Sequence, residues 1–281
     1  MHPVHVVVVA YHGAAELDRA LAAVTGEATL TVVDNSQSEA VRIVCEQRRA
    51  RYLPTSGNLG FAAGVNVALR EILAGDPCDV LLLNPDAMLP EEAVGRLAAV
   101  LAADNRASAV APTLVHPSGR PQRSLWPFPS PRQAWLEAVG LARLQRGPSF
   151  AVGTVLLLRW EALQEVGLFD ERFFLYAEET DWQRRAHELG WHAALCPDVI
   201  AAHVGGATSV DPARRERLFY AAQELYVRKW HGSRGWMVYR LAVIAGAAVR
   251  ALVLPPPRRA EAGRRLLAYL RGPHRVAAAG G

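Results

Sequence analysis

The first 115 residues alternate between short apolar runs and amphipathic segments. Val4 to Ala10 is a continuous, mostly β-branched run, which is typical of a strand buried on both faces of a parallel sheet. Glu16–Val24 then has the spacing of an amphipathic helix. Further strands are predicted at 30–33, 52–54, 80–83 and 110–115, and helices at 41–49, 65–73 and 91–103. This order predicts an α/β fold with a mostly parallel central sheet flanked by helices.

Short polar motifs follow three of these strands directly. They are "AYHG", "DNS" and "NPD". Ligands of such sheets bind beyond the carboxyl ends of the strands. We therefore expect a ligand site that includes Asp34 and Asp86.

The chain changes character after residue 115. The segment 117–148 is rich in proline and predicts an irregular excursion with one short helix, of the kind that often forms a lid or binding loop. Beyond it, strands are predicted at 150–159 and 192–196, and helices at 178–189 and 214–229. These boundaries predict a catalytic domain over 1–210, with halves at about 1–115 and 116–210, and a helical appendage over 211–281.

The appendage contains the apolar stretch "WMVYRLAVIAGAAVRALVLPPPRR". A spanning helix needs about 20 mostly apolar residues, and here Arg240 and Arg250 interrupt the run. A helix that lies on a membrane surface and a helix that packs on the catalytic domain both fit the pattern. The basic residues near the C-terminus favour the membrane surface.

Composition narrows the class of protein. The chain has 281 residues, 51% of them hydrophobic and 21% charged, and a net charge of +4, which suits one sizeable folded domain with an appendage. Its three cysteines are scattered, which argues against a disulfide framework and fits the reducing cytoplasm. The apolar N-terminus lacks the basic region of a signal peptide and predicts a first strand.

The stretch "FLYAEETDW" concentrates Glu178, Glu179 and Asp181 among aromatic residues. One interpretation is a helix start, because acidic residues in a first turn complement the helix dipole. The other is a catalytic site, because one of several clustered acids tends to have a raised pKa and can act as a base.

Other motifs also have two interpretations. Asp34 can bind ribose hydroxyls or can serve a turn. The glycines of "SGNLGFAAGVN" allow close backbone approach to phosphate at a helix start, or only tight packing. Asp86 can hold Mg²⁺ or Mn²⁺ together with substrate phosphates, or can belong to an Asn-Pro-Asp turn.

The ordered set of motifs resembles family 2 glycosyltransferases of the GT-A fold, in the bacterial rhamnosyltransferase-like branch. The matching pieces run from residue 4 to 209: "VVVVAYHG", "TVVDNS", "SGNLGFAAGVNVAL", "LLLNPDAML", "AVGTVLLLRWEALQEVGLFDERFFLYAEETDWQRRAHELGW" and "PDVIAAHVGGATS". Each piece alone is a weak signal, and their order makes the resemblance specific. It implies a nucleotide-sugar-binding GT-A fold.

The resemblance also implies roles for residues. The donor nucleotide-sugar would contact Ala10, Tyr11, Asp34, Asn58, Gly60, Phe61, Asn66, Asn84 and Gly153. Asp86 would hold a divalent cation, Mg²⁺ or Mn²⁺, with His203 completing the site; Asn84 stands where the family has the first Asp of its metal motif. The catalytic base would be Glu179, which stands where the family usually has Asp, with Glu178 and Asp181 as the other candidates.

These roles describe an inverting glycosyltransferase. By resemblance it would transfer rhamnose from dTDP-rhamnose to a glycan or lipid-linked acceptor in cell-envelope polysaccharide synthesis. We expect it in the cytoplasm, peripheral on the inner face of the membrane, with no nucleic-acid partner. A sugar-phosphate nucleotidyltransferase and a non-catalytic nucleotide-sugar- or glycan-binding protein are the alternatives.

Overall fold

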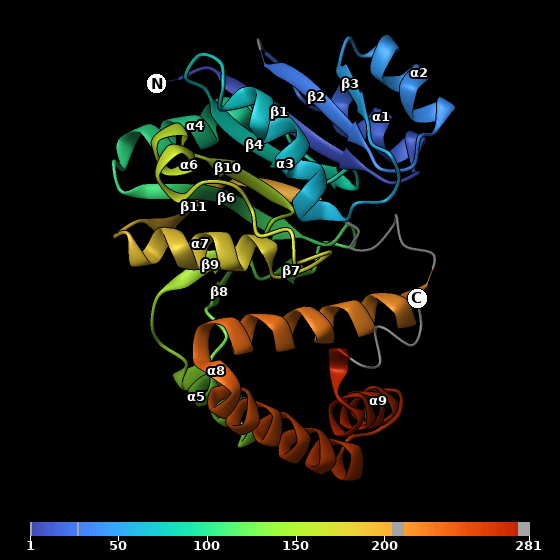
Figure 1. The fold of residues 1–281 in the computed structure, drawn as a ribbon, viewed down its shortest axis with the longest axis vertical. Coiled ribbons are helices and arrows are strands. Elements are labelled where there is room, and N and C mark those ends of the chain that lie inside the picture. Colours follow the sequence, from blue (N-terminus) through green and yellow to red (C-terminus); the bar gives the residue numbers. More distant parts are fainter. Residues whose placement is uncertain (1, 27, 204–210, 275–281) are drawn as a thin grey trace. The chain divides into compact units, whose positions relative to one another are not determined.

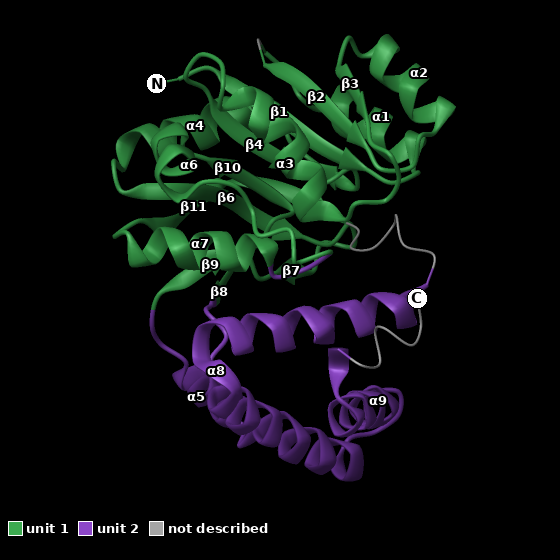
Figure 2. Cartoon of the chain, viewed as in Figure 1, with its two compact units in different colours: residues 1–126, 148–174, 178–210 green, residues 127–147, 175–177, 211–281 purple. Residues whose placement is uncertain are grey.

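The computed structural model describes residues 2–26, 28–203 and 211–274, and within them the chain forms two compact units (Figure 2). Unit 1 comprises residues 1–126, 148–174 and 178–210. Unit 2 comprises residues 127–147, 175–177 and 211–281. The C-terminal unit therefore also takes in part of the proline-rich excursion and three residues just before the acidic motif.

Unit 1 is built on a nine-stranded sheet in the order β3-β2-β1-β4-β10-β6-β11-β5, with β7 paired to β6 (Figure 1). The first four strands of that order pair in parallel. Their bounds are β1 Val4–Ala10, β2 Thr29–Asp34, β3 Arg51–Pro54 and β4 Asp79–Leu83. The register sets Ala10 opposite Asp34 and Asp34 opposite Pro54, so the ends of these strands meet at one edge, as predicted.

Helices cover both faces of this sheet because its central strands are apolar on both sides. Val6 and Val8 of β1 pack with one group of helices, and Val7 packs with the other. The first group is α1 Ala14–Ala22, α2 Glu39–Gln47 and α4 Ala93–Ala103. The second group is α3 Phe61–Ile72, α6 Trp160–Val166 and α7 Glu178–Glu188. The predicted α/β architecture is confirmed.

The second half of the sheet departs from the parallel pattern. The continuous strand expected over 150–159 is instead two strands, β9 Ser149–Ala151 and β10 Val155–Leu158, broken at Gly153. β10 runs antiparallel between β4 and β6. The same sheet contains β5 Ala87–Met88, β6 Ala107–Val115, β7 Pro121–Gln122 and β11 His192–His203. β8 Leu125–Pro127 pairs with β9 in a separate two-stranded sheet. β11 is longer than predicted because it pairs with β6 across two register shifts and then with β5.

Unit 2 is helical. It contains α5 Pro131–Ala138, the short 3-10 helix η1 Ala142–Leu144, the long α8 Pro212–Val253 and α9 Arg258–Arg271. α8 bends at Gly232, whose φ of 65° and ψ of −175° are not helical. An added Cβ at Gly246 would lie 2.9 Å from the Cα atom of Ala138, so the small residue lets α8 approach α5 closely.

An aromatic cluster joins α8 to α9. The rings of Tyr220 and Tyr269 have centroids 5.4 Å apart, and those of Trp236 and Tyr269 are 5.9 Å apart. Arg240 donates to the backbone oxygens of Tyr269 and Leu270 at the end of α9. By length and composition α8 is apolar enough to cross a membrane, and 33% of its most apolar window is buried within the protein.

Candidate functional site

Asp34 ends β2 with its side chain fully buried. Its Oδ1 atom accepts hydrogen bonds from the N–H and hydroxyl of Ser36, at 2.8 and 2.6 Å. Its Oδ2 atom accepts from the Ser38 N–H at 2.8 Å and from the Tyr52 hydroxyl at 2.9 Å. A ribose hydroxyl that binds this carboxylate would therefore have to replace one of these donors. The contact with the nucleoside stays a prediction.

The neighbouring Asn35 holds the glycine-rich loop. Its Nδ2 atom donates to the Gly60 oxygen at 2.9 Å, and its Oδ1 atom accepts from the Thr55 hydroxyl at 3.0 Å. Asn58 accepts from the Gly60 N–H through its own side chain. Sequence analysis singled out Asn58 and Gly60 but missed Asn35 and Thr55, since their role depends on contacts 20 to 25 residues away.

Gly60 starts α3 at a point of close approach. Its φ is +82°, and an added Cβ would lie 2.3 Å from the Phe174 oxygen. That oxygen accepts the Phe61 N–H at 2.7 Å. The helix start proposed for phosphate is thus tied to the segment just before the acidic motif.

Asn66 makes a second tie between α3 and the same segment. Its amide accepts from the Phe169 N–H at 2.9 Å and donates to the Phe169 oxygen at 2.9 Å. It also donates to Glu171. The side chain is buried, so it acts here as a clamp on residues 169–171. Its predicted contact with the nucleotide is not tested.

Asp86 and His203 come together across the β5–β11 pair. The pairing sets His203 opposite Ala87, and the His203 Nε2 atom lies 3.4 Å from the Asp86 Oδ1 atom. Asp86 is largely buried. Asn84 forms the turn before it, since its oxygen accepts the Ala87 N–H and its N–H donates to the Thr154 oxygen.

Gln122 orients His203 from the other side. Its Oε1 atom lies 3.3 Å from the His203 Nδ1 atom, and its Nε2 atom donates to the His203 backbone oxygen. A proton on Nδ1 satisfies this contact and leaves Nε2 with its lone pair toward Asp86. Ligand histidines in metal sites usually have such a partner on the other ring nitrogen. Sequence analysis missed Gln122.

This arrangement fits a divalent cation. Within residues 2–26, 28–203 and 211–274 the structure has no group of three or more His, Cys, Asp or Glu side chains that could hold a metal alone. One carboxylate and one imidazole would therefore share the ion with substrate phosphates, which is how Mg²⁺ is commonly bound. An imidazole ligand favours Mn²⁺ more than it favours Mg²⁺.

The acidic motif forms the first turn of α7, as the helix-start interpretation predicted. The Oε2 atoms of Glu178 and Glu179 are both buried, and neither has a hydrogen-bond partner among the described residues. Gln183 fixes the helix by exchanging two hydrogen bonds with Ala151 of β9, at 2.8 and 2.7 Å. This docking brings Glu179 beside Gly153, where an added Cβ would lie 3.3 Å from the Glu179 Cγ atom.

The environments of the two glutamates raise their pKa values. Burial, followed by the charge of Glu179, raises the pKa of Glu178 well above its usual value. Burial also raises the pKa of Glu179, against the lowering effect of nearby backbone N–H groups that include Gly153. Both carboxyl groups therefore favour the protonated form more than a free glutamate does, and the charge of Glu179 adds to this effect at Glu178. A carboxylate with a raised pKa suits general base catalysis near neutral pH.

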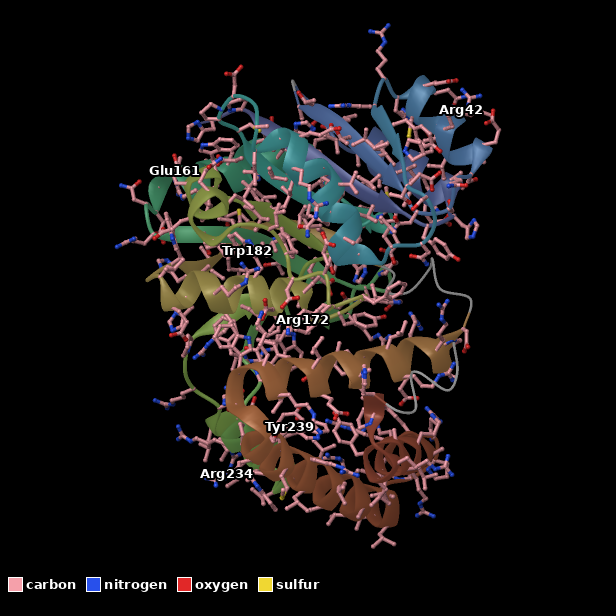
Figure 3. All side chains as sticks on the ribbon, in the orientation of Figure 1. Arg42, Glu161, Arg172, Trp182, Arg234 and Tyr239 are labelled. Atoms are coloured by element: carbon pink, nitrogen blue, oxygen red, sulfur yellow. The ribbon has the colours of Figure 1, made fainter. Side chains whose placement is uncertain are left out.

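Asp181 and Trp182 have other partners. Asp181 is fully buried, and its Oδ2 atom lies 3.2 Å from the Arg185 Nε atom. Trp182, labelled on α7 in Figure 3, is fully buried and donates to the Gly167 oxygen. Because its ring is fully buried, Trp182 cannot stack on a sugar face. The ion pair of Asp181 makes Glu179 the better candidate for the base.

The remaining site residues are distributed around the same edge of unit 1. Ala10 is buried, and its oxygen accepts the Asn35 N–H. Tyr11 is 37% exposed just beyond β1. Two consecutive residues lie between the Asp86 turn and the acidic motif. The Thr154 oxygen accepts the Asn84 N–H, and Gly153 lies beside Glu179. Residues 204–210, which complete the last matching motif, lie outside the described part of the chain.

The two residues before the acidic motif have unusual backbone angles. Tyr176 and Ala177 have φ values of 71° and 64°, and such left-handed angles are uncommon for residues other than glycine. The Tyr176 ring packs edge-on against Phe219 of α8, with centroids 5.7 Å apart. Both residues belong to unit 2.

Comparison with known proteins accords with this geometry. The family described as "Glycosyltransferase like family 2" matches residues 2–249. The chain is 26% identical over 301 residues to N-acetylglucosaminyl-diphospho-decaprenol L-rhamnosyltransferase of Mycobacterium tuberculosis, covering 96% of this chain and 98% of that one. It is 26% identical to the low-salt glycan biosynthesis hexosyltransferase Agl10 of Haloferax volcanii, over 70% of this chain and 66% of that one.

A solved structure shares the fold. The mannosyltransferase PcManGT from Pyrobaculum calidifontis, in complex with GDP-Man and Mn²⁺, aligns with a TM-score of 0.63 and 17% identity, covering 98% of this chain and 87% of that one. The fold is that of the GT-A glycosyltransferases. The chain belongs to glycosyltransferase family 2, with rhamnosyltransferases among its relatives.

Proposed function

We propose that this glycosyltransferase inverts the anomeric centre in one direct displacement, with Glu179 as the base. The buried, unpaired Oε2 atom of Glu179 carries this proposal. The acceptor oxygen forms a bond to the anomeric carbon, and its proton passes to Glu179. The bond from the anomeric carbon to the diphosphate oxygen breaks, and its electron pair leaves with the nucleoside diphosphate.

Asp86 and His203 would hold a divalent cation, Mn²⁺ or Mg²⁺, that neutralises charge on the departing diphosphate. The 3.4 Å approach of the two side chains supports this assignment. Asn84 shapes the turn that aims Asp86, and Gln122 holds the His203 ring. Burial raises the pKa of Glu178 well above its usual value, which favours the protonated acid beside the base.

We infer that the donor is dTDP-rhamnose and that the acceptor is a lipid-linked glycan of the cell envelope. The mycobacterial relative, matched along nearly its whole length, is named for rhamnosyl transfer to N-acetylglucosaminyl-diphospho-decaprenol. A lipid-linked acceptor places the reaction at a membrane. The apolar and basic C-terminal helices support peripheral contact with the inner face of the cytoplasmic membrane.

A donor screen tests the reaction. Purified protein with Mn²⁺ is given dTDP-, UDP- and GDP-sugars, with a membrane lipid extract as acceptor, and nucleoside diphosphate release is measured. We expect release from dTDP-rhamnose, and a product of inverted anomeric configuration by NMR. Glu179→Gln should slow release roughly 10²- to 10⁴-fold. Glu91→Gln, at an exposed position without hydrogen-bond partners among the described residues, should leave it unchanged.

The same screen separates the alternatives. Release from a UDP- or GDP-sugar, with none from dTDP-rhamnose, would show that the donor is that other nucleotide-sugar. A product with retained configuration would exclude direct displacement. Full activity of Glu179→Gln would exclude Glu179 as the base.

A further inference from the structure

The second half of α8 presents an apolar face to solvent. Successive residues are about 100° apart around a helix, and the exposed positions fall on one side of it. They are Met237, Val238, Leu241, Ala245, Val249, Leu252 and Val253, and Leu252 is 78% exposed. None of these seven side chains is charged, and the exposed Arg234 lies about one turn before Met237. The opposite side, with Tyr239, Ala242, Val243 and Gly246, is buried within unit 2.

The sequence around this face is basic. Residues 225–260 contain no Asp or Glu. They contain seven cationic side chains: Arg228, Lys229, Arg234, Arg240, Arg250, Arg258 and Arg259. Arg234, labelled near the bend of α8 in Figure 3, is exposed at the start of the apolar face. An apolar face with a cationic surround is typical of helices that lie at the surface of an anionic bilayer.

A cavity in the same unit adds a more specific feature. It has a volume of about 440 Å³ and is lined by Glu224, Arg228, Arg240, Leu270, Arg271, Gly272 and His274. Glu224 is paired with Arg228 at 2.8 Å and accepts the His274 backbone N–H. The lining thus has one acidic side chain and three arginines. The side chains of Arg271 and His274 have no hydrogen bond or ion pair within the described part of the chain.

The cavity borders the apolar face. Arg240, which lines the cavity, lies one helical turn from Met237 and Ile244 on α8. Leu270, which also lines it, is 53% exposed at the end of α9. An amphiphile with a phosphorylated head and an apolar tail matches this pairing of arginines with exposed apolar side chains.

We propose that the Arg228–Arg240–Arg271 cavity binds the phosphate head group of an anionic phospholipid while the apolar face of α8 enters the bilayer interface. This proposal rests on the peripheral membrane contact proposed above. A second copy of the chain fits less well, because a symmetric contact through this face would bring the two sets of arginines together.

Vesicle flotation of the full chain, without donor or acceptor, tests the proposal. We expect the protein to float with phosphatidylcholine vesicles that contain phosphatidylglycerol, and much less with phosphatidylcholine alone. Arg271→Gln should weaken partition about fivefold, since one basic side chain near an anionic surface contributes about 1 kcal/mol. The matched control is Arg143→Gln, an exposed arginine of the same unit outside the cavity, which should change partition less than twofold.

A second pair of variants tests the apolar face. Leu241→Glu combined with Leu252→Glu should reduce partition more than tenfold, because both side chains are exposed and would carry charge into the interface. Ile43→Glu, at an exposed apolar position of α2 in unit 1, is the control. Circular dichroism confirms that each variant is folded.

Each contrary outcome has a distinct meaning. Equal losses in Arg271→Gln and Arg143→Gln would overturn the cavity as a head-group site and leave only diffuse attraction. Equal effects of the double variant of α8 and of Ile43→Glu on partition would overturn the apolar face as the membrane contact. A wild-type dimer that dissociates in the double variant would assign this face to a second copy of the chain. A wild-type protein that binds no vesicle yet releases nucleoside diphosphate would refute membrane contact while the transferase reaction stands.

Discussion

The Nε2 atom of His203 lies 3.4 Å from the Oδ1 atom of Asp86, and Gln122 holds the far side of the same imidazole ring. Two short strand pairings create this contact. β5 pairs with β11 to place His203, and β7 pairs with β6 to place Gln122. The contact thus joins the two proposed metal ligands to a residue that orients one of them.

Gln122→Leu should therefore weaken Mn²⁺ binding without unfolding the protein. Loss of the partner of a ligand histidine typically costs 10- to 100-fold in metal affinity or activity. The Mn²⁺ concentration that gives half-maximal activity measures this change in apparent affinity. Gln47→Leu, at an exposed position of α2, is the control, and equal Mn²⁺ requirements in the two variants would show that His203 is not a ligand.

Substitution of the two buried glutamates should change kcat to very different extents. Glu179→Gln should lower kcat roughly 10²- to 10⁴-fold, the usual contribution of a general base. Glu178→Gln should retain most activity, because glutamine resembles the protonated acid that burial favours at position 178. A larger loss in Glu178→Gln than in Glu179→Gln would reverse the assignment of the base.

The pH profile of kcat follows from the same burial. The base must be ionised, and the pKa of Glu179 is raised, so activity should fall as pH drops through a value above about 4.3, the ordinary pKa of glutamate. If kcat falls only at or below the ordinary pKa of glutamate, the base is not a buried carboxylate.

Glu178 should also make stability depend on pH. Its folded-state pKa lies above its unfolded value, so its contribution is fully present below the unfolded pKa and is lost as pH rises through the folded pKa. Glu178→Gln should raise Tm at pH 8, by about 2–4 °C for each kcal/mol recovered, and should have little effect at pH 4. Glu91→Gln should change Tm at neither pH.

Phe219 should influence catalysis through the segment before α7. Tyr176 and Ala177 hold left-handed angles, which cost about 1–3 kcal/mol each and persist only when surrounding contacts enforce them. Phe219→Ala removes the ring that packs on Tyr176 and should lower kcat several-fold with little change in donor KM. Phe219→Tyr keeps the ring that packs on Tyr176 and should behave as wild type. An unchanged kcat in Phe219→Ala would show that other contacts hold the segment.

Local pattern predicted the apolar strands, the helices on both faces and the helix start at Glu178, because each depends on spacing along the chain. It did not predict Asn35, Gln122 or Gln183 as organisers of the site. Their partners lie 20 to 81 residues away, so no local pattern marks them. The apolar run 150–159 also concealed a break at Gly153, where the chain turns beside Glu179 and Asn84. The glycine itself is the local signal of such a break.

The close approach of Gly60 to the Phe174 oxygen allows opening of the glycine-rich loop to be followed by hydrogen exchange. The Phe61 amide is the one that donates to that oxygen, at 2.7 Å, so its proton can exchange with solvent only when the glycine-rich loop separates from the segment before α7. Deuterium uptake at this single amide would report the opening of the donor side in solution. The Asn35 N–H, which donates to Ala10 within the strand ends, would supply the internal reference for a site that stays closed.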